Sequence, residues 1–161
     1  MDYIIIFVAQ YLIFILPLLI GVILFRLPKS QRLPFTITAG TGTILSFVGI
    51  FVASHLFYDP RPFITSHVIP LFSHPADNGF PSDHTTIAAT LAFIGYVFSK
   101  KLGLIMIPIA LAVGIARVLA HVHSWIDIVG GIGIAFLATL AAIYIGRYIA
   151  SILPHTKARA S

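Results

Sequence analysis

Long apolar runs separated by short polar stretches make up most of the chain. A helix needs roughly 20 predominantly apolar residues to cross a bilayer. The apolar runs place five helices, at about residues 3–25, 35–57, 84–99, 102–121 and 126–152. The third run is short, and the fourth contains Pro108, which neighbouring helices can accommodate in a membrane bundle. The pattern therefore predicts an all-α integral membrane helical bundle of about five transmembrane helices, forming a single domain over residues 1–161.

The first apolar run follows Met1-Asp2 directly and has no basic residues ahead of it. It is longer than the apolar part of a signal peptide, and no small-residue cleavage site follows it. We interpret it as a retained first helix.

Composition supports membrane insertion. The chain is 58% hydrophobic and 9% charged, whereas soluble domains carry about 25% charged residues. Cysteine is absent, which excludes a disulfide framework, a thiol nucleophile and a thiolate metal site.

The basic residues predict the orientation. If five helices alternate, one side of the membrane receives eight basic residues: Arg26, Lys29, Arg32, Lys100, Lys101, Arg147, Lys157 and Arg159. By the positive-inside rule this side is cytoplasmic, together with the C-terminus. All five acidic residues and two arginines, Arg61 and Arg117, fall on the other side. The net charge of +5 is thus explained by topology, and no nucleic-acid partner is needed.

The connection from Tyr58 to Asp83 is longer than most helix connections, and connections beyond about 12–15 residues are usually functional or disordered. Several apolar residues suit it to the membrane interface. We therefore expect a long extracytoplasmic loop with a functional role.

His123 and Asp127 lie four residues apart and would share one face of a helix. An aspartate that accepts from one imidazole nitrogen leaves the other free as a nucleophile or base. The stretch from Ser124 to Asp127 also has the pattern of a capping box that opens the fifth helix. Both interpretations are compatible.

His121 precedes His123 by two residues, so on a helix the two side chains point apart. Metal binding would need further ligands, and no ligand cluster accompanies this pair. We expect neither a metal nor another cofactor.

Pro81-Ser82-Asp83-His84 has the pattern of a helix start, with Ser82 or Asp83 as the N-cap. A helix N-terminus suits a phosphate, because its free N–H groups and partial positive charge attract anions. Ser82 can add a hydroxyl donor and His84 a proton. A plain helix cap is the simpler alternative.

Arg61 and Arg117 are harder to explain structurally. A guanidinium binds phosphate oxygens with two donors and stays charged. The alternatives are snorkelling to lipid headgroups, or an ion pair of Arg61 with Asp59 or of Arg117 with Asp127.

Together, Arg61-Pro62, the Pro81–His84 motif and the arrangement Arg117-x5-His123-x3-Asp127 resemble the three signatures of the type 2 phosphatidic acid phosphatase superfamily. Within it, the segments around Arg61 and from Asn78 to Thr85 are most similar to bacterial undecaprenyl-diphosphate phosphatases of the bacitracin-resistance type. Asp83 contributes to this similarity, because many other members have glycine at that position.

Two positions depart from the family pattern. Ser54 stands where the first motif usually has lysine, with His55 beside it as a candidate replacement in phosphate binding. Ala116 stands where the third motif usually has serine.

The resemblance implies a metal-independent lipid phosphatase with a phosphohistidine intermediate on His123. Asp127 would orient His123, and His84 would protonate the leaving oxygen. Phosphate would be bound by Arg61, Arg117, Ser82 and Asp83, with His55 as a further candidate. The opposed proton requirements of His123 and His84 predict a bell-shaped pH–rate profile.

The expected substrate is a membrane lipid phosphate, namely undecaprenyl diphosphate hydrolysed outside the cytoplasmic membrane. Phosphatidylglycerophosphate, phosphatidic acid and lipid A phosphates are alternatives. A non-catalytic scaffold or transporter subunit is a second alternative, favoured by Ser54. Vanadium haloperoxidases share the motifs but are soluble and larger.

Overall fold

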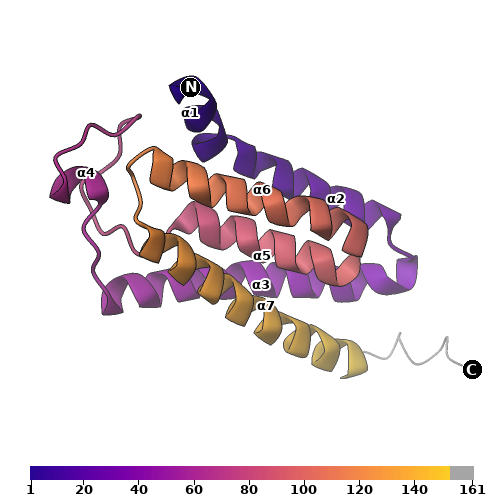
Figure 1. Cartoon of the computed structure of the whole chain (residues 1–161). Helices are drawn as coiled ribbons and strands as arrows, with labels where there is room; N and C mark the ends of the chain where they lie inside the picture. Colours follow the sequence, from indigo (N-terminus) through magenta and orange to yellow (C-terminus); the bar gives the residue numbers. More distant parts are fainter. Residues whose placement is uncertain (153–161) are drawn as a thin grey trace, which may run out of the picture.

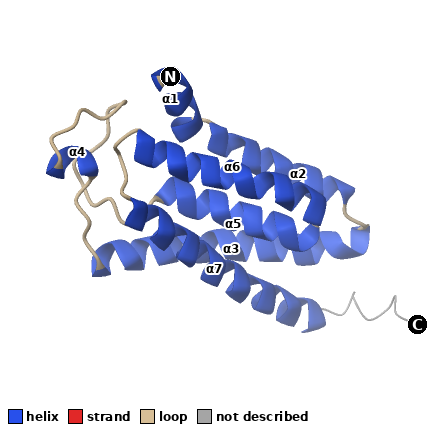
Figure 2. Ribbon diagram, viewed as in Figure 1, coloured by secondary structure: helices blue, strands red, loops and turns tan. Residues whose placement is uncertain are grey.

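A computed structural model describes residues 1–152, and this part of the chain is helical and contains no β-strand (Figures 1 and 2). The elements are α1 (Asp2–Gln10), the 3-10 turn η1 (Leu12–Phe14), α2 (Ile15–Arg26), α3 (Lys29–Leu56), α4 (Pro62–Thr65), α5 (Asp83–Phe98), α6 (Lys100–Leu119) and α7 (Trp125–Ile152). The predicted all-α class is confirmed for the described residues.

Where one helix was predicted over residues 3–25, the chain forms two. The axis turns by 41° between Asp2–Gln10 and Leu12–Arg26. Pro17 explains the break, because it has no N–H for the carbonyl four residues earlier and its ring clashes with that carbonyl.

The second helix begins at Lys29, six residues before the predicted start at residue 35. Pro34 lies in the second turn of α3, where its missing N–H removes one hydrogen bond near an exposed helix end. The Arg32 side chain donates to the carbonyls of Leu27 and Phe25 at 3.1 and 3.0 Å. It thereby caps the end of α2 and fixes the tight turn between α2 and α3.

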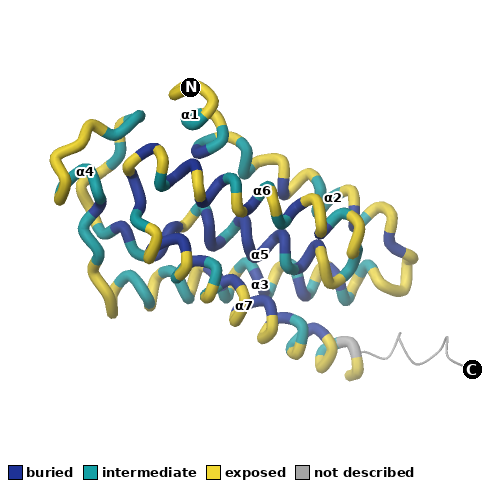
Figure 3. Tube along the Cα trace, in the orientation of Figure 1, coloured by how far each residue is buried: buried dark blue, intermediate teal, exposed yellow. Residues whose placement is uncertain are grey.

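Helix α5 lies at the centre of the bundle and packs against α2, α3, α6 and α7 (Figure 1). Helix α5 is largely buried (Figure 3), and its small side chains Ala88 and Ala92 lie in the core. A Cβ on Gly103 of α6 would collide with the backbone of Tyr96, so glycine is required for the close approach of these two helices. This packing fixes the first turn of α5, where a phosphate-binding motif was predicted.

Three helices, α3, α6 and α7, are long and apolar enough to cross a membrane, and the bent pair of α1 and η1–α2 makes a fourth if it counts as one span. Helix α5 has 16 residues, fewer than the roughly 20 of a typical span. Many large apolar side chains on the outer surface are exposed, as expected for contact with lipid. Five crossings stay a prediction.

The ends of the bundle differ in chemistry. One end of the bundle, on the left in Figure 1, carries residues 57–82, which include α4. Helices α3 and α6 terminate at this end, and helices α5 and α7 start there. The turns at the opposite end hold the basic residues Arg26, Lys29, Arg32, Lys100 and Lys101. Lys157 and Arg159, predicted on the same side, lie outside the described residues.

Candidate active site

A cavity of about 350 Å³ opens at the end where the three motifs meet. It is lined by Ile50, Ser54, Arg61, His74, Asp77, Asn78, Phe80, Pro81, Asp83, His84, Arg117 and His123. The packing thus brings Arg61, Asp83, His84, Arg117 and His123 around one space, although they lie on four separate parts of the chain.

Three predicted site residues do not line this cavity. Ser82 is fully buried and acts as the N-cap of α5, since its Oγ accepts from Thr85 N at 3.4 Å and from Thr85 Oγ1 at 3.0 Å. His55 is exposed at the end of α3, with its Nδ1 2.7 Å from the carbonyl of Phe51. Asp127 is fully buried behind His123.

His123 and Asp127 form the predicted pair. His123 Nδ1 lies 3.1 Å from Asp127 Oδ2, and both side chains are buried. The same Oδ2 accepts from Ser124 N at 2.9 Å, while Asp127 N donates to Ser124 Oγ at 3.4 Å. The capping box and the His–Asp pair are therefore both present. Because Asp127 is anchored to the start of α7, it fixes the ring of His123.

Gly79 lies directly against this carboxylate. A Cβ at position 79 would come within 2.8 Å of Asp127 Oδ2 and 3.1 Å of the Asp59 carbonyl. Glycine is therefore needed where the loop passes behind the His–Asp pair.

The other imidazole nitrogen of His123 faces two guanidinium groups. Its Nε2 lies 3.3 Å from Arg61 Nη1 and 3.3 Å from Arg117 Nη2. Since Nδ1 bonds to a carboxylate, Nε2 carries the lone pair and accepts from both arginines. An anion that draws these donors away would leave Nε2 beside it with a free lone pair.

Arg61 is held in place by three further hydrogen bonds. Its Nε donates to Asp77 Oδ1 at 2.7 Å, its Nη1 to the Val122 carbonyl at 2.7 Å and its Nη2 to the Asn78 carbonyl at 3.2 Å. The pairs considered from the sequence, Arg61 with Asp59 and Arg117 with Asp127, are not among the ion pairs of the described residues. Asp59 instead accepts from Ser124 Oγ at 2.6 Å.

Arg117 is buried at the end of α6 and less fully bonded. Its Nη2 also lies 3.0 Å from His74 Nε2, its guanidinium carbon lies 5.4 Å from the centre of the Phe72 ring, and its Nε has no hydrogen-bond partner within residues 1–152.

Sequence reasoning missed three cavity residues, all in the loop: His74, Asp77 and Asn78. The sequence pattern assigned His74 no role, and it lines the cavity. A long loop between two motifs was the available signal, but it does not indicate which of its polar side chains turn inward.

Asn78 joins the loop to the end of α3. Its Nδ2 donates to the carbonyls of Ser54 and Phe57, both at 2.8 Å. Its Oδ1 accepts from the N–H groups of Asp59 at 2.9 Å and Phe80 at 3.0 Å. The amide thus uses its full hydrogen-bonding capacity to fix the loop on both sides of Arg61.

The charges in the cavity suit an anion that brings its own hydrogen-bond acceptors. Burial lowers the pKa of His123 below its ordinary 6.5, and the hydrogen bond to Asp127 opposes this effect. Burial and the two guanidinium groups lower the pKa of His74 to about 4. Both imidazoles are therefore neutral near pH 7.

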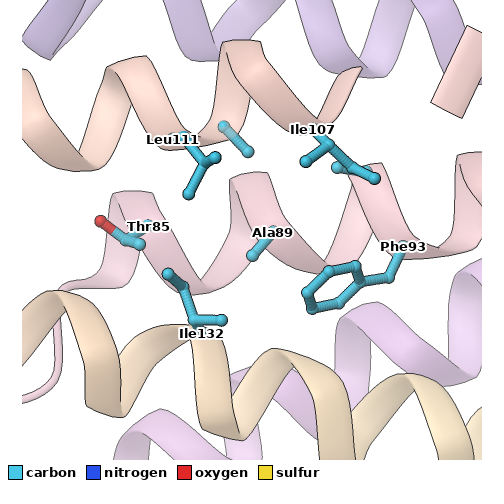
Figure 4. Close-up of a pocket in the computed structure, with 8 residues that line it drawn as sticks. Thr85, Ala89, Phe93, Ile107, Leu111 and Ile132 are labelled. Carbon is cyan, nitrogen blue, oxygen red and sulfur yellow. The ribbon is translucent and has the colours of Figure 1, made fainter. Parts of the chain in front are cut away.

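No group of three or more His, Cys, Asp or Glu side chains with the geometry of a metal site occurs within residues 1–152. A second, smaller cavity of about 30 Å³ lies between α5, α6 and α7 (Figure 4). Ala89, Phe93 and Leu111 are typical of its lining, which contains no charged side chain. Of these two cavities, the one of about 350 Å³ therefore holds the charged and titratable side chains.

Comparisons with known proteins agree on one family. The PAP2 superfamily profile matches residues 35–150. The bacitracin transport permease protein BcrC of Bacillus licheniformis is 32% identical over 142 residues, which cover 86% of this chain and 67% of that protein. The undecaprenyl-diphosphatase BcrC of Bacillus subtilis (strain 168) is 29% identical over 138 residues, covering 85% of this chain and 70% of that protein.

Two solved structures are similar. The crystal structure of Aquifex aeolicus LpxE matches with a TM-score of 0.68 and 26% identity, covering 89% of this chain and 85% of that one. A transmembrane PAP2 type phosphatidylglycerolphosphate phosphatase from Bacillus subtilis matches with a TM-score of 0.61 and 21% identity, covering 92% of this chain and 77% of that one. At 21% identity, the second structure shows a similarity of fold alone.

Proposed function

The chain belongs to the PAP2 superfamily, as its three motifs predicted, and we propose that it is a membrane phosphatase that removes the terminal phosphate of undecaprenyl diphosphate. The observation that carries this proposal is the environment of His123: a buried carboxylate on Nδ1 and two guanidinium groups at Nε2. This arrangement suits a nucleophile next to a phosphate site.

In the proposed reaction, the terminal phosphate takes over hydrogen bonds from Arg61 and Arg117, and His123 Nε2 attacks its phosphorus. The bond from phosphorus to the bridging oxygen breaks, and its electron pair stays on that oxygen, which receives a proton from His84. Water then attacks the phosphohistidine, gives its proton to neutral His84, and releases phosphate. The guanidinium groups stabilise the negative charge on the transferring group.

Asp127 and Asp83 have different parts in this scheme. Asp127 keeps Nδ1 protonated and stabilises the positive charge that develops on the ring during attack. Asp83 lines the cavity at the start of α5, next to His84. Ser82 acts from beneath the cavity by capping α5, which holds His84 and the free N–H groups of the first turn in place.

A lipid substrate is supported by a wide groove of about 690 Å³ between α2 and α3, floored by α5. Its lining is almost entirely apolar and includes Phe47 on α3 and Ile87 on α5. Ile50 and Asp83, one turn further on the same helices, line the phosphate cavity. A headgroup in the cavity would therefore direct its hydrocarbon tail into this groove.

The choice of undecaprenyl diphosphate follows the relative from Bacillus subtilis that bears this activity in its name. Phosphatidylglycerophosphate, phosphatidic acid and lipid A phosphates are the competing substrates of the same chemistry. We place the cavity on the extracytoplasmic side and the C-terminus in the cytoplasm, because the basic turns lie at the opposite end of the bundle.

Phosphate release by the detergent-purified protein tests the proposal. We expect turnover of undecaprenyl diphosphate to exceed that of phosphatidylglycerophosphate, and a chelator to leave it unchanged, since arginines do the work of a metal. Replacing the nucleophile, His123→Ala, should lower turnover by about a thousandfold or more.

His121→Asn is the matched control, because His121 is exposed in the same turn and adopts a left-handed backbone (φ 60°) that asparagine tolerates. Near-normal turnover in His123→Ala would contradict the assignment of the nucleophile. Preference for phosphatidylglycerophosphate would transfer the proposal to that substrate, and absence of any phosphate release would favour a non-catalytic scaffold.

A further inference from the structure

The phosphate cavity contains a side chain that the proposed reaction does not use. His74 comes from the loop and lines the cavity with His84 and His123. Its ring centre lies 6.1 Å from that of His123 at an angle of 75°. The role of this third imidazole rests on the phosphate site proposed above.

The arginines and aspartates that line the cavity balance one another when both aspartates are ionised. Two arginines, Arg61 and Arg117, face two aspartates, Asp77 and Asp83. A phosphate group with two negative charges therefore needs additional positive charge. His123 has to stay neutral to attack, so the imidazoles of His74 and His84 are the remaining cavity groups that can supply it.

The part of α3 that faces the cavity offers no substitute cation. Ser54 lines the cavity with a hydroxyl that donates to the Phe51 carbonyl at 2.9 Å. Its neighbour His55 is exposed and bonds to the same carbonyl. The candidate role of His55 in phosphate binding thus finds no support in the geometry.

His74 is directed to the point where the anion would bind. Its Nδ1 lies 3.4 Å from the Pro75 carbonyl and its Nε2 3.0 Å from Arg117 Nη2, so the neutral ring carries its proton on Nδ1 and accepts at Nε2. His123 Nε2 accepts from the same Arg117 nitrogen. An oxygen that takes over the donors of Arg117 therefore comes within reach of both Nε2 atoms.

We propose that His74 is a third phosphate-binding residue: when the substrate's phosphate group arrives, His74 Nε2 takes up a proton and donates it in a hydrogen bond to an oxygen that Arg117 also binds. The low pKa of His74 in the absence of an anion supports this order of events, because burial and the two guanidinium groups disfavour the protonated ring. A bound dianion reverses the electrostatic part of that effect.

Calorimetric binding of tungstate to the purified full-length protein at pH 7 tests the proposal. Tungstate is a tetrahedral dianion that does not itself titrate at this pH, so protons taken up on binding belong to the protein. Repeating the titration in buffers of different ionisation enthalpy gives the number of protons. His74→Asn should bind tungstate about 10- to 100-fold more weakly and take up about one proton fewer than the wild type.

The matched control is His67→Asn, which changes an exposed histidine of the same loop and should alter neither quantity. A third variant, His74→Lys, places a permanent cation there and should bind well without the extra proton uptake. Wild-type affinity in His74→Asn would overturn the proposal, and so would weaker binding with unchanged proton uptake, which would reduce His74 to a positioning role.

The outcome is separable from that of the proposed function. A wild type that binds tungstate with the expected proton uptake but hydrolyses no lipid phosphate contradicts the phosphatase activity and leaves the role of His74 intact. Normal lipid turnover by the wild type, together with unchanged tungstate affinity and proton uptake in His74→Asn, contradicts the role of His74 and leaves the phosphatase activity intact.

Discussion

His123 combines burial with hydrogen bonds on both ring nitrogens. The carboxylate of Asp127 fixes the tautomer on one side, and two guanidinium groups approach the lone pair on the other. Burial makes the charged ring unfavourable, so the proposed nucleophile is neutral at physiological pH. Its reactivity thus depends on protonation state as much as on position.

The acid dependence of kcat/KM tests this state, because this parameter reports the free enzyme. The pKa of His123 in the folded protein lies below 6.5, so kcat/KM should fall at acid pH as the lone pair is protonated. It should also fall at alkaline pH as His84 loses the proton that it donates, which gives the bell-shaped profile. An acid limb with a midpoint above pH 6.5 would contradict a neutral nucleophile.

Folding stability should decrease over the same range of pH. His74 has a pKa of about 4 when folded and 6.5 when unfolded, so the unfolded chain binds more protons between these values and gains stability relative to the fold. The unfolding temperature in detergent should therefore fall from pH 6.5 towards pH 4. His74→Asn should fall less steeply, and an equally steep fall in that variant would exclude His74 as a source.

Among the elements, the loop of residues 57–82 is the least regular, and the site depends on it. It supplies Arg61, His74 and Asp77 to the cavity, and the four hydrogen bonds of Asn78 attach it to α3 and to itself. Asn78 thereby positions its neighbours on the chain.

Asn78→Ala should therefore lower activity more than stability. Losing these bonds and leaving backbone N–H groups unpaired should cost about 2 kcal/mol, or about 4–8 °C in unfolding temperature. Since Arg61 would lose its fixed position, kcat/KM should fall about a hundredfold. Parallel measurements on the exposed loop variant Ser66→Ala provide the control, and an equal loss of activity there would point to general loop damage.

Local signals explain which elements the sequence could predict. The helix starts at Ser82 and Ser124 were predictable because a cap and its partner lie within four residues of each other. The inward turn of His74 was not, because it depends on the path of an aperiodic loop across the ends of α3 and α6. The break after Gln10 lies between these cases, since Pro17 marks a disruption without fixing its position.

At the scale of the whole molecule, the proposed headgroup site and the proposed tail site are separate. The cavity with the three motifs lies at one end of the bundle, and the apolar groove between α2 and α3 begins about one helical turn away from it on α3 and α5. In the proposed function, helix packing therefore selects the lipid tail and the motifs select the headgroup.

Filling the groove should affect long substrates selectively. Gly40 lines the groove, and a Cβ there would meet no other atom within 4 Å, so Gly40→Leu can be accommodated by the fold. It should raise KM for undecaprenyl diphosphate about tenfold and leave a short-chain isoprenyl diphosphate unaffected. Gly133→Leu, at an equally open position on α7, should change neither, and equal effects on both substrates would argue against the groove.

The predicted orientation can be measured because the chain has no native cysteine. Single cysteines at two exposed serines, Ser66→Cys in the loop and Ser30→Cys at the basic end, should react differently with a membrane-impermeant thiol reagent on intact cells. We expect labelling at position 66 and protection at position 30. The reverse pattern would place the cavity in the cytoplasm.

The turns between α2 and α3 and between α5 and α6 lie at the far end of the molecule from every group that lines the phosphate cavity. We expect that lengthening the chain there would leave the residues of the cavity in place. The length of the helices can accordingly be adjusted to bilayers of different thickness by adding or removing helical turns at that end. A fluorescent or affinity label inserted there should report on the protein without changing its turnover.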